Sequence, residues 1–207
     1  MNKVFLFDFD STLINEEVID CLAAKAGVTE EVSGITSSAM AGEIDFSESL
    51  IRRVSLLSGL SVTALDEVRA SITLTKGAEE LISDLQARGD LVAVVSGGFT
   101  EVISPKLDTL KISRYRANSL EIIDGKLSGK VQGKIIDRRA KAEFLKEIAF
   151  SSGITISNTV AIGDGANDID MIQTAGIGVA FCAKPALIEV ANRVINTRDL
   201  REVLKVI

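Results

Sequence analysis

The chain has 207 residues, with 23 Lys and Arg against 29 Asp and Glu, and it contains no histidine. The missing histidine excludes Ser-His-Asp and Cys-His catalysis and histidine-liganded zinc, so any general acid or base must be another residue type. The net charge of −6 argues against sequence-independent binding to nucleic acid or anionic membranes, and no apolar stretch approaches the roughly 20 residues of a membrane span, so we expect a soluble, cytoplasmic protein.

The first predicted element is a buried strand at Val4–Phe9, a short and almost continuously apolar run of the kind found in parallel sheets. The stretch that follows, Glu16–Ile72, contains no convincing strand. Its apolar spacing predicts several helices instead, among them Glu17–Ala26, Glu30–Ala41 and Phe46–Leu57. We therefore expect a small helical cap domain at residues 15–73, inserted after the first strand, and an α/β core formed by residues 1–14 and 74–207.

Beyond the expected cap, helices and strands alternate. Amphipathic spacing predicts helices at Ala78–Leu85, Ala140–Ile148 and Pro185–Ala191. Apolar runs predict strands at Leu91–Val95, Thr159–Ile162 and Gly178–Phe181. Asp124-Gly125 between two apolar stretches predicts a β-hairpin, which we interpret as structural rather than substrate-binding. The alternation is typical of a Rossmann-like α/β fold with a parallel sheet and right-handed crossovers.

Acidic residues follow two of the predicted strands. Asp8 and Asp10 come directly after the first strand and share one side of an extended chain, and Asp164 follows the strand Thr159–Ile162. If these strands are neighbours, the three aspartates converge, and three hard oxygen donors with open positions suit Mg²⁺. For each acidic stretch taken alone, a helix cap or a polar turn is the alternative interpretation.

Two further features gain meaning only beside these acidic residues. Ser96-Gly97-Gly98 follows the strand Leu91–Val95 and offers a hydroxyl and backbone N–H groups to an anion, although the same residues also suit an ordinary loop. Lys141 lies in the helix before the strand Thr159–Ile162, where a lone lysine is usually solvated.

Taken together and in this order, these motifs resemble those of the haloacid dehalogenase superfamily of phosphotransferases: DFDST from Asp8, SGG from Ser96, Lys141, and GDGAND from Gly163. Longer stretches, among them AMAGEIDFSESLIRRVSLL and FCAKP, are similar to the phosphoserine phosphatases within that superfamily. The resemblance implies Mg²⁺-dependent hydrolysis of O-phospho-L-serine to L-serine and phosphate through an aspartyl-phosphate, the last step of serine biosynthesis.

The resemblance also assigns roles to the core residues. It implies Asp8 as the nucleophile and Asp10 as the general acid and base, a role that requires a protonated Asp10 when substrate arrives. Mg²⁺ is expected at Asp8, the backbone carbonyl of Asp10 and Asp164. Further roles are implied for the remaining motif residues: transition-state contacts for Ser96, Gly97 and Lys141, support for these from Asn167, and a metal-bound water for Asp168.

In the cap, the resemblance implies four substrate-binding residues. Glu17 matches the acidic residue for the substrate ammonium, and Arg53 matches its partner for the carboxylate, which a planar guanidinium binds in a bidentate manner. Met40 and Phe46 match apolar residues that close over the site. Arg52, directly before Arg53, points about 100° away on a helix and is interpreted as solvated.

Three alternatives to phosphoserine hydrolysis stay open at this stage. The same chemistry serves a phosphotransferase that passes the phosphoryl group to another alcohol such as homoserine, or a phosphatase for another small phosphomonoester. A non-catalytic Mg²⁺-binding module on the same fold is the third. The expected partner is a small molecule, and the sequence leaves a monomer and a homodimer equally open.

Overall fold

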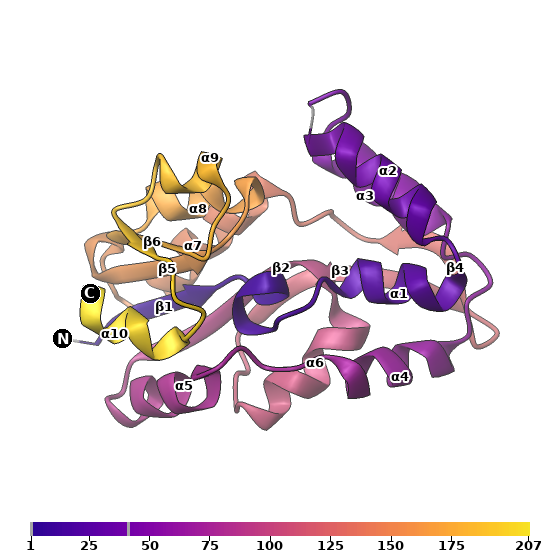
Figure 1. The fold of residues 1–207 in the computed structure, drawn as a ribbon. Coiled ribbons are helices and arrows are strands. Elements are labelled where there is room, and N and C mark those ends of the chain that lie inside the picture. The colour runs from indigo at the N-terminus through magenta and orange to yellow at the C-terminus, as the bar shows by residue number, and fades with distance from the viewer. Residues whose placement is uncertain (1, 41) are drawn as a thin grey trace.

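A single mixed sheet organises the structure, a computed structural model that describes residues 2–40 and 42–207. The sheet has seven strands in the order β4-β3-β2-β1-β5-β6-β7. Figure 1 shows the sheet together with the helices that surround it. The strands are β1 (Val4–Phe7), β2 (Leu91–Phe99), β3 (Tyr115–Ile123), β4 (Lys126–Gln132), β5 (Thr159–Gly163), β6 (Ile177–Phe181) and β7 (Arg193–Ile195). Neighbouring strands are parallel except for the β3–β4 hairpin.

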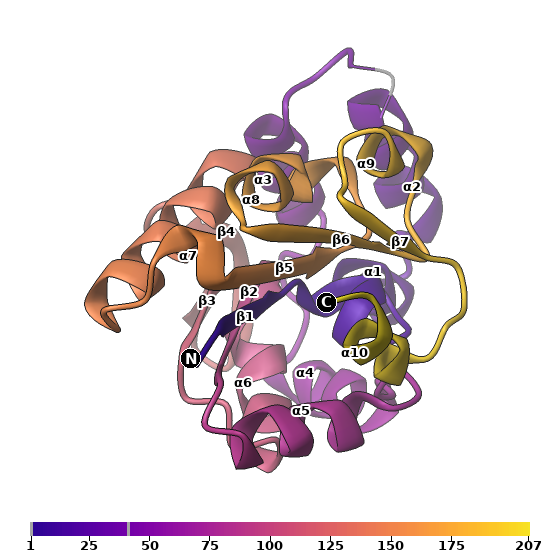
Figure 2. The ribbon, with the colours of Figure 1, turned by 90° about the vertical axis from the view of Figure 1, so that its left-hand side faces the viewer.

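Helices cover both faces of this sheet, which gives three layers (Figure 2). Helices α5, α6 and α10 pack on one face, and α7, α8 and α9 pack on the other. The helices of the described residues are α1 (Val18–Ala26), α2 (Thr29–Met40), α3 (Phe46–Ser55), α4 (Val62–Ser71), α5 (Ala78–Ala87), α6 (Thr100–Thr109), α7 (Arg138–Ser151), α8 (Ile169–Thr174), α9 (Pro185–Ile188) and α10 (Val203–Val206). The predicted α/β fold with a parallel sheet is confirmed.

Strand β1 shows why its sequence is apolar throughout. Phe5 and Phe7 belong to the core on one side of the sheet, whereas Val4 and Leu6 belong to the core on the other side. All four side chains are at most 1% exposed. A central parallel strand covered on both faces cannot alternate polar and apolar residues, so the continuous apolar run is what this position requires.

Of the predicted boundaries that differ from the structure, three have a clear local cause. The first strand ends at Phe7, because Phe9–Leu13 forms a tight turn in which the N–H of Ile14 donates to the carbonyl of Phe9 over 3.1 Å. The second strand extends through Ser96 to Phe99, with a shift of register against β3. Helix α9 ends at Ile188 rather than Ala191, because Asn192 then bonds to Gly178 through its N–H and side chain and leads into β7.

Helices α1 to α4 lie between β1 and α5, as predicted for the stretch after the first strand. The predicted helix Glu30–Ala41 corresponds to α2, and its expected last residue, Ala41, lies outside the described residues, as does Met1. The two segments that lead into and out of these helices run side by side, with Ile14 and Leu74 forming an antiparallel bridge.

The β3–β4 hairpin has the predicted turn. Asp124 and Gly125 both adopt the left-handed backbone that this turn requires, with φ of 49° and 73°. The hairpin is tied to the loop between α3 and α4, because Leu127 exchanges 2.8 Å hydrogen bonds with Gly59 and Leu60. Its turn is absent from the wall of the cavity described below, which agrees with a structural role.

Candidate active site

The register of the sheet brings the predicted motifs to one edge. Phe7 of β1 pairs with Val94 of β2 on one side and with Ile162 of β5 on the other. Asp8, Ser96 and Asp164 follow these positions within two residues, so they meet at the carboxyl ends of three adjacent parallel strands. The N–H of Asp8 donates to the carbonyl of Ile162 over 2.9 Å, which continues the β1–β5 ladder up to the site.

A buried lysine joins two of the aspartates. The Nζ of Lys141 lies 2.9 Å from Asp8 Oδ1 and 2.7 Å from Asp168 Oδ1, and the lysine is 0% exposed. Burial lowers the pKa of Lys141, but the charges of Asp168 and Asp8 outweigh this effect and raise the pKa above its ordinary value. Lys141 is therefore a permanent cation beneath Asp8.

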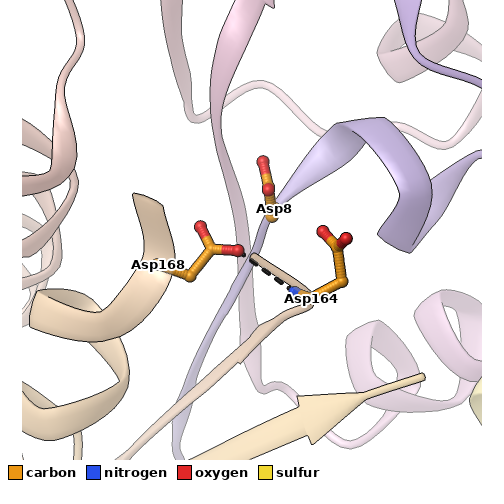
Figure 3. A group of neighbouring side chains, drawn as sticks. All are labelled: Asp8, Asp164 and Asp168. Carbon is orange, nitrogen blue, oxygen red and sulfur yellow. Dashed lines mark hydrogen bonds between the residues drawn. The ribbon is translucent and has the colours of Figure 1, made fainter. Parts of the chain in front are cut away.

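The second oxygen of Asp168 holds the loop that carries Asp164. It accepts a hydrogen bond from the N–H of Asp164 at 3.1 Å (Figure 3) and another from the N–H of Gly165 at 3.2 Å. A Cβ on Gly163 would lie 2.4 Å from this same oxygen, so only glycine allows the loop to approach Asp168 so closely. Both oxygens of Asp168 are thus engaged within the protein, whereas the Asp164 carboxylate accepts, among the described residues, a single long hydrogen bond, at 3.5 Å from the Thr12 hydroxyl.

Carboxylate oxygens of Asp8, Asp164 and Asp168 lie within 4.8 Å of one another (Figure 3). Burial and then the charge of Asp168 raise the pKa of Asp8 well above its ordinary value, and the same two causes raise the pKa of Asp164 to about 7. Such crowding is relieved when a cation binds, and hard oxygen donors are the ligands that divalent ions of the Mg²⁺ and Ca²⁺ type prefer. The residues present fit a divalent metal site.

The side chain of Asp10 points to other partners. Its Oδ1 accepts from the N–H of Val18 at 3.1 Å, and its Oδ2 accepts from the Ser96 hydroxyl at 3.2 Å. Burial, followed by the charge of Glu17, raises the pKa of Asp10 to about 7. A Cβ on Gly98 would lie 2.6 Å from Asp10 Oδ2, so the glycine leaves room for this carboxyl. Asp10 can therefore carry a proton near neutral pH.

A cavity of about 760 Å³ lies above these aspartates and is also lined by residues of α1, α2 and α3. Ser96 and Lys141 are fully buried behind its wall. The sequence-predicted residues that line the cavity are Asp8, Asp10, Glu17, Met40, Phe46, Arg53, Gly97, Asp164 and Asn167. The cavity therefore joins the acidic site to the predicted substrate-binding residues of the helical insertion.

Opposite charges face this cavity from the helical insertion. Arg53 is half-buried and donates to the Ser49 carbonyl at 3.3 Å and to the Thr36 hydroxyl at 3.5 Å. Burial lowers the pKa of Arg53, while the carboxylates of Asp20 and Glu17 act in the opposite direction. Glu17, just before α1, accepts a 2.7 Å hydrogen bond from the Ser11 hydroxyl.

Arg52, in contrast, is exposed, as predicted, and it pairs with Glu48 on the same helix. The ring of Phe46 lies against Gly97, whose added Cβ would meet it at 3.1 Å, while Met40 is 68% exposed at the mouth of the cavity.

The sequence patterns predict no role for several polar residues of the wall, namely Asp20, Thr36, Ser49, Arg138 and Lys184. Asp20 lies three residues after Glu17 and Ser49 lies four residues before Arg53, so helical spacing could have placed both beside the predicted substrate-binding residues. Lys184 lies in the FCAKP stretch, which could have drawn attention to it.

Among the described residues, no helix combines the length and the apolar character needed to cross a membrane.

The sequence model of the haloacid dehalogenase-like hydrolases matches residues 5–173. A phosphoserine phosphatase of Methanocaldococcus jannaschii is 50% identical over 205 residues, which are 99% of this chain and 97% of that protein. A solved structure of a phospho-aspartyl intermediate analogue of phosphoserine phosphatase is 50% identical, with a TM-score of 0.93, and the match covers 99% of this chain and 98% of that one. A substrate-bound phosphoserine phosphatase complex is 49% identical, with a TM-score of 0.94 and the same coverage.

Proposed function

Because this chain belongs to the haloacid dehalogenase-like hydrolase family, we propose that it hydrolyses O-phospho-L-serine to L-serine and phosphate, the reaction that ends serine biosynthesis. The observation that carries this proposal is a single cavity with the Asp8 carboxylate and its buried lysine at one end and Glu17 and Arg53 in the helical wall. Phosphoserine offers a phosphate, an ammonium and a carboxylate, and this cavity has a complementary group for each. The chain is thus a phosphoric monoester hydrolase.

The reaction proceeds in two displacements. An oxygen of Asp8 attacks phosphorus and the bond from phosphorus to the seryl oxygen breaks, while Asp10 gives its proton to that oxygen. Asp10 then accepts a proton from a water molecule that attacks the aspartyl-phosphate, which releases phosphate and restores Asp8. Lys141 holds Asp8 in place, and Ser96 orients Asp10 through the 3.2 Å hydrogen bond.

We propose that this site takes Mg²⁺, which Asp8, Asp164 and the backbone carbonyl of Asp10 would hold. The chemistry it would supply is neutralisation of charge on the phosphoryl oxygens. Asp168 supports this site from behind by holding Lys141 and the backbone of Asp164 and Gly165. Asn167 and the Gly97 backbone, which line the cavity, assist at the phosphoryl group.

The helical insertion selects the substrate. Glu17 binds the ammonium, Arg53 binds the carboxylate, and Met40 and Phe46 exclude water from the bound phosphoserine. We place the boundaries of this cap domain at residues 15–73, where Ile14 and Leu74 bridge the two connecting segments, and assign residues 1–14 and 74–207 to the core. We further propose a cytoplasmic enzyme, monomeric or homodimeric, and the net charge of −6 supports the absence of a nucleic-acid or membrane partner.

Phosphate release from O-phosphoserine tests this function. Purified protein with MgCl₂ is expected to release phosphate well above an Asp8→Asn variant, which lacks the nucleophile. Homoserine added to the same assay distinguishes transfer from hydrolysis, because transfer yields phosphohomoserine. Release equal to that of the Asp8→Asn variant, or phosphohomoserine as the main product, would contradict the proposal.

Arg53 offers a test of substrate recognition. Arg53→Ala is expected to lower kcat/KM for phosphoserine by about 10- to 150-fold, the equivalent of about 1.5–3 kcal/mol for a hydrogen bond to a charged group. O-Phosphoethanolamine lacks the carboxylate, so its kcat/KM should stay nearly unchanged. Arg52→Ala is the matched control, because Arg52 lies outside the cavity wall. Equal losses with both substrates would show that Arg53 does not read the carboxylate.

Mg²⁺ is expected to stabilise the fold, and more strongly at pH 8 than at pH 5. The pKa of Asp164 is about 7 in the fold, whereas an aspartate in an unfolded chain ionises near pH 4. The metal-free fold therefore holds a proton that the unfolded chain releases, and its stability falls as pH rises from about 4 to 7. Mg²⁺ competes with that proton and adds about 2.7 kcal/mol at 100 times its Kd.

Melting temperatures with MgCl₂ and with EDTA, at both pH values, provide the measurement. Asp164→Asn should lose most of the Mg²⁺-dependent shift. An equal shift at pH 5 and pH 8, or a full shift in Asp164→Asn, would place the ion elsewhere.

A further inference from the structure

Arg198 connects the end of the chain to the turn that carries the catalytic aspartates. It lies after β7 and is exposed. Its Nε donates to Asn15 Oδ1 at 2.8 Å, and its Nη2 donates to the carbonyls of Ser11 and Ile14, each at 3.3 Å. One guanidinium thus contacts both the turn after Asp8 and the segment that leads into the helical insertion.

Asn15 extends this contact to the returning segment. Its Nδ2 donates to the Thr73 hydroxyl at 2.9 Å and to the Leu74 carbonyl at 3.2 Å, and its N–H donates to the Thr73 carbonyl at 3.0 Å. Glu16 accepts from the N–H and the hydroxyl of Thr73 at 2.9 and 2.7 Å. Arg198 and Asn15 therefore hold together both connections between the sheet and the helical insertion.

The same contacts hold a backbone conformation that is unfavourable on its own. Ser11 has a φ of 55°, a left-handed conformation that costs a residue other than glycine about 1 kcal/mol or more and persists only when its surroundings impose it. Its N–H donates to the Glu16 carbonyl at 3.1 Å, its hydroxyl donates to Glu17 at 2.7 Å, and its carbonyl accepts from Arg198. Ser11 directly follows Asp10 and donates its hydroxyl to Glu17, so the backbone conformation of Ser11 determines where Asp10 and Glu17 lie relative to each other.

We propose that Arg198 is a positioning residue that, through Asn15 and Ser11, sets where Glu17 and the helical insertion stand relative to Asp8 and Asp10. Arg198 does not line the cavity, so it acts through these residues rather than on the substrate. The planar guanidinium suits this task because its N–H groups point in fixed directions toward several acceptors at once. The inference rests on the proposed function where it concerns phosphoserine.

Arg198→Gln tests the proposal, with Arg193→Gln as the matched control. Arg193 is another exposed arginine that donates to backbone carbonyls, those of Asn192 and Val206, which lie away from the two connections. Arg198→Gln is expected to raise KM for phosphoserine about tenfold, comparable to the loss of one charged hydrogen bond. For p-nitrophenyl phosphate, which lacks the ammonium and carboxylate, kcat/KM should change less than about threefold. Arg198→Lys should recover only part of the loss, and Arg193→Gln should match the wild type with both substrates.

Hydrogen exchange provides a readout that needs no substrate. The N–H groups of Asn15 and Thr75 bond to the Thr73 and Leu13 carbonyls, and Arg198→Gln should make them exchange faster than Arg193→Gln does. A wild type that is inactive on phosphoserine would overturn the proposed function and leave this exchange comparison to decide the role of Arg198. Equal losses with both substrates, or unchanged exchange at Asn15 and Thr75, would overturn the positioning role.

Discussion

Replacing Lys141 by methionine is expected to lower kcat by about 10²- to 10³-fold, a loss comparable to that caused by removing one preorganised donor from an active site. The Lys141 ammonium bonds to Asp8 at 2.9 Å and to Asp168 at 2.7 Å with no exposure to solvent. Methionine preserves the length and packing of the side chain but removes the charge. Asp8 then loses the cation that orients it toward phosphorus.

The same substitution should destabilise the fold in a pH-dependent way. Removing one member of a buried ion pair leaves an uncompensated charge, which typically costs about 3–5 kcal/mol. Burial already raises the pKa of Asp8, and without the lysine its pKa rises further, so at low pH the carboxyl takes up a proton and avoids much of that cost. The destabilisation is therefore expected to be larger at pH 8 than at pH 5.5.

Urea unfolding in EDTA at both pH values measures this effect, and Lys146→Met is the control. Lys146 lies on the same helix, α7, but is exposed, so its loss should change stability by no more than about 0.5 kcal/mol. Wild-type turnover in Lys141→Met, or equal unfolding of the two variants, would contradict the role of Lys141 as the cation that holds Asp8.

The elements of this fold differ in how far the sequence alone predicts them. β1 was predictable because a strand covered on both faces must be apolar at every position. β7 has only three residues, Arg193–Ile195, two of them exposed, so it carries no periodic pattern to detect. Helix α6 contains Pro105, which in a sequence indicates an interruption rather than a helix.

For the site, the residue types at the strand ends predicted which aspartates meet, because parallel strands place their carboxyl ends at one edge. The sequence could not predict that Lys141 is fully buried, since burial depends on how α7 packs on the sheet. The contacts of Arg198 were equally out of reach, because they join three segments that are distant in the sequence and leave no local pattern.

Asp10→Asn is expected to lower kcat for phosphoserine by about 10²- to 10⁴-fold, the range that general acid–base catalysis contributes, with little change in substrate affinity. Asparagine keeps the size and polarity of Asp10, and its single amide oxygen can still accept from the N–H of Val18, while its NH₂ group can donate to the hydroxyl oxygen of Ser96. It cannot transfer a proton to the seryl oxygen or remove one from water. Binding therefore persists while both chemical steps slow.

The pH profile separates this role of Asp10 from a purely structural one. With a pKa near 7, Asp10 loses its proton as pH rises through neutrality, so wild-type kcat/KM for phosphoserine should decline on the alkaline side. The residual activity of Asp10→Asn has no such proton to lose and should lack that decline. p-Nitrophenolate leaves without protonation, so the variant's aspartyl-phosphate should still form from p-nitrophenyl phosphate, and its slow hydrolysis should appear as a burst of nitrophenolate in rapid mixing. A decline that persists in Asp10→Asn, or equal slowing of the burst and the steady state, would assign the proton transfer to another group.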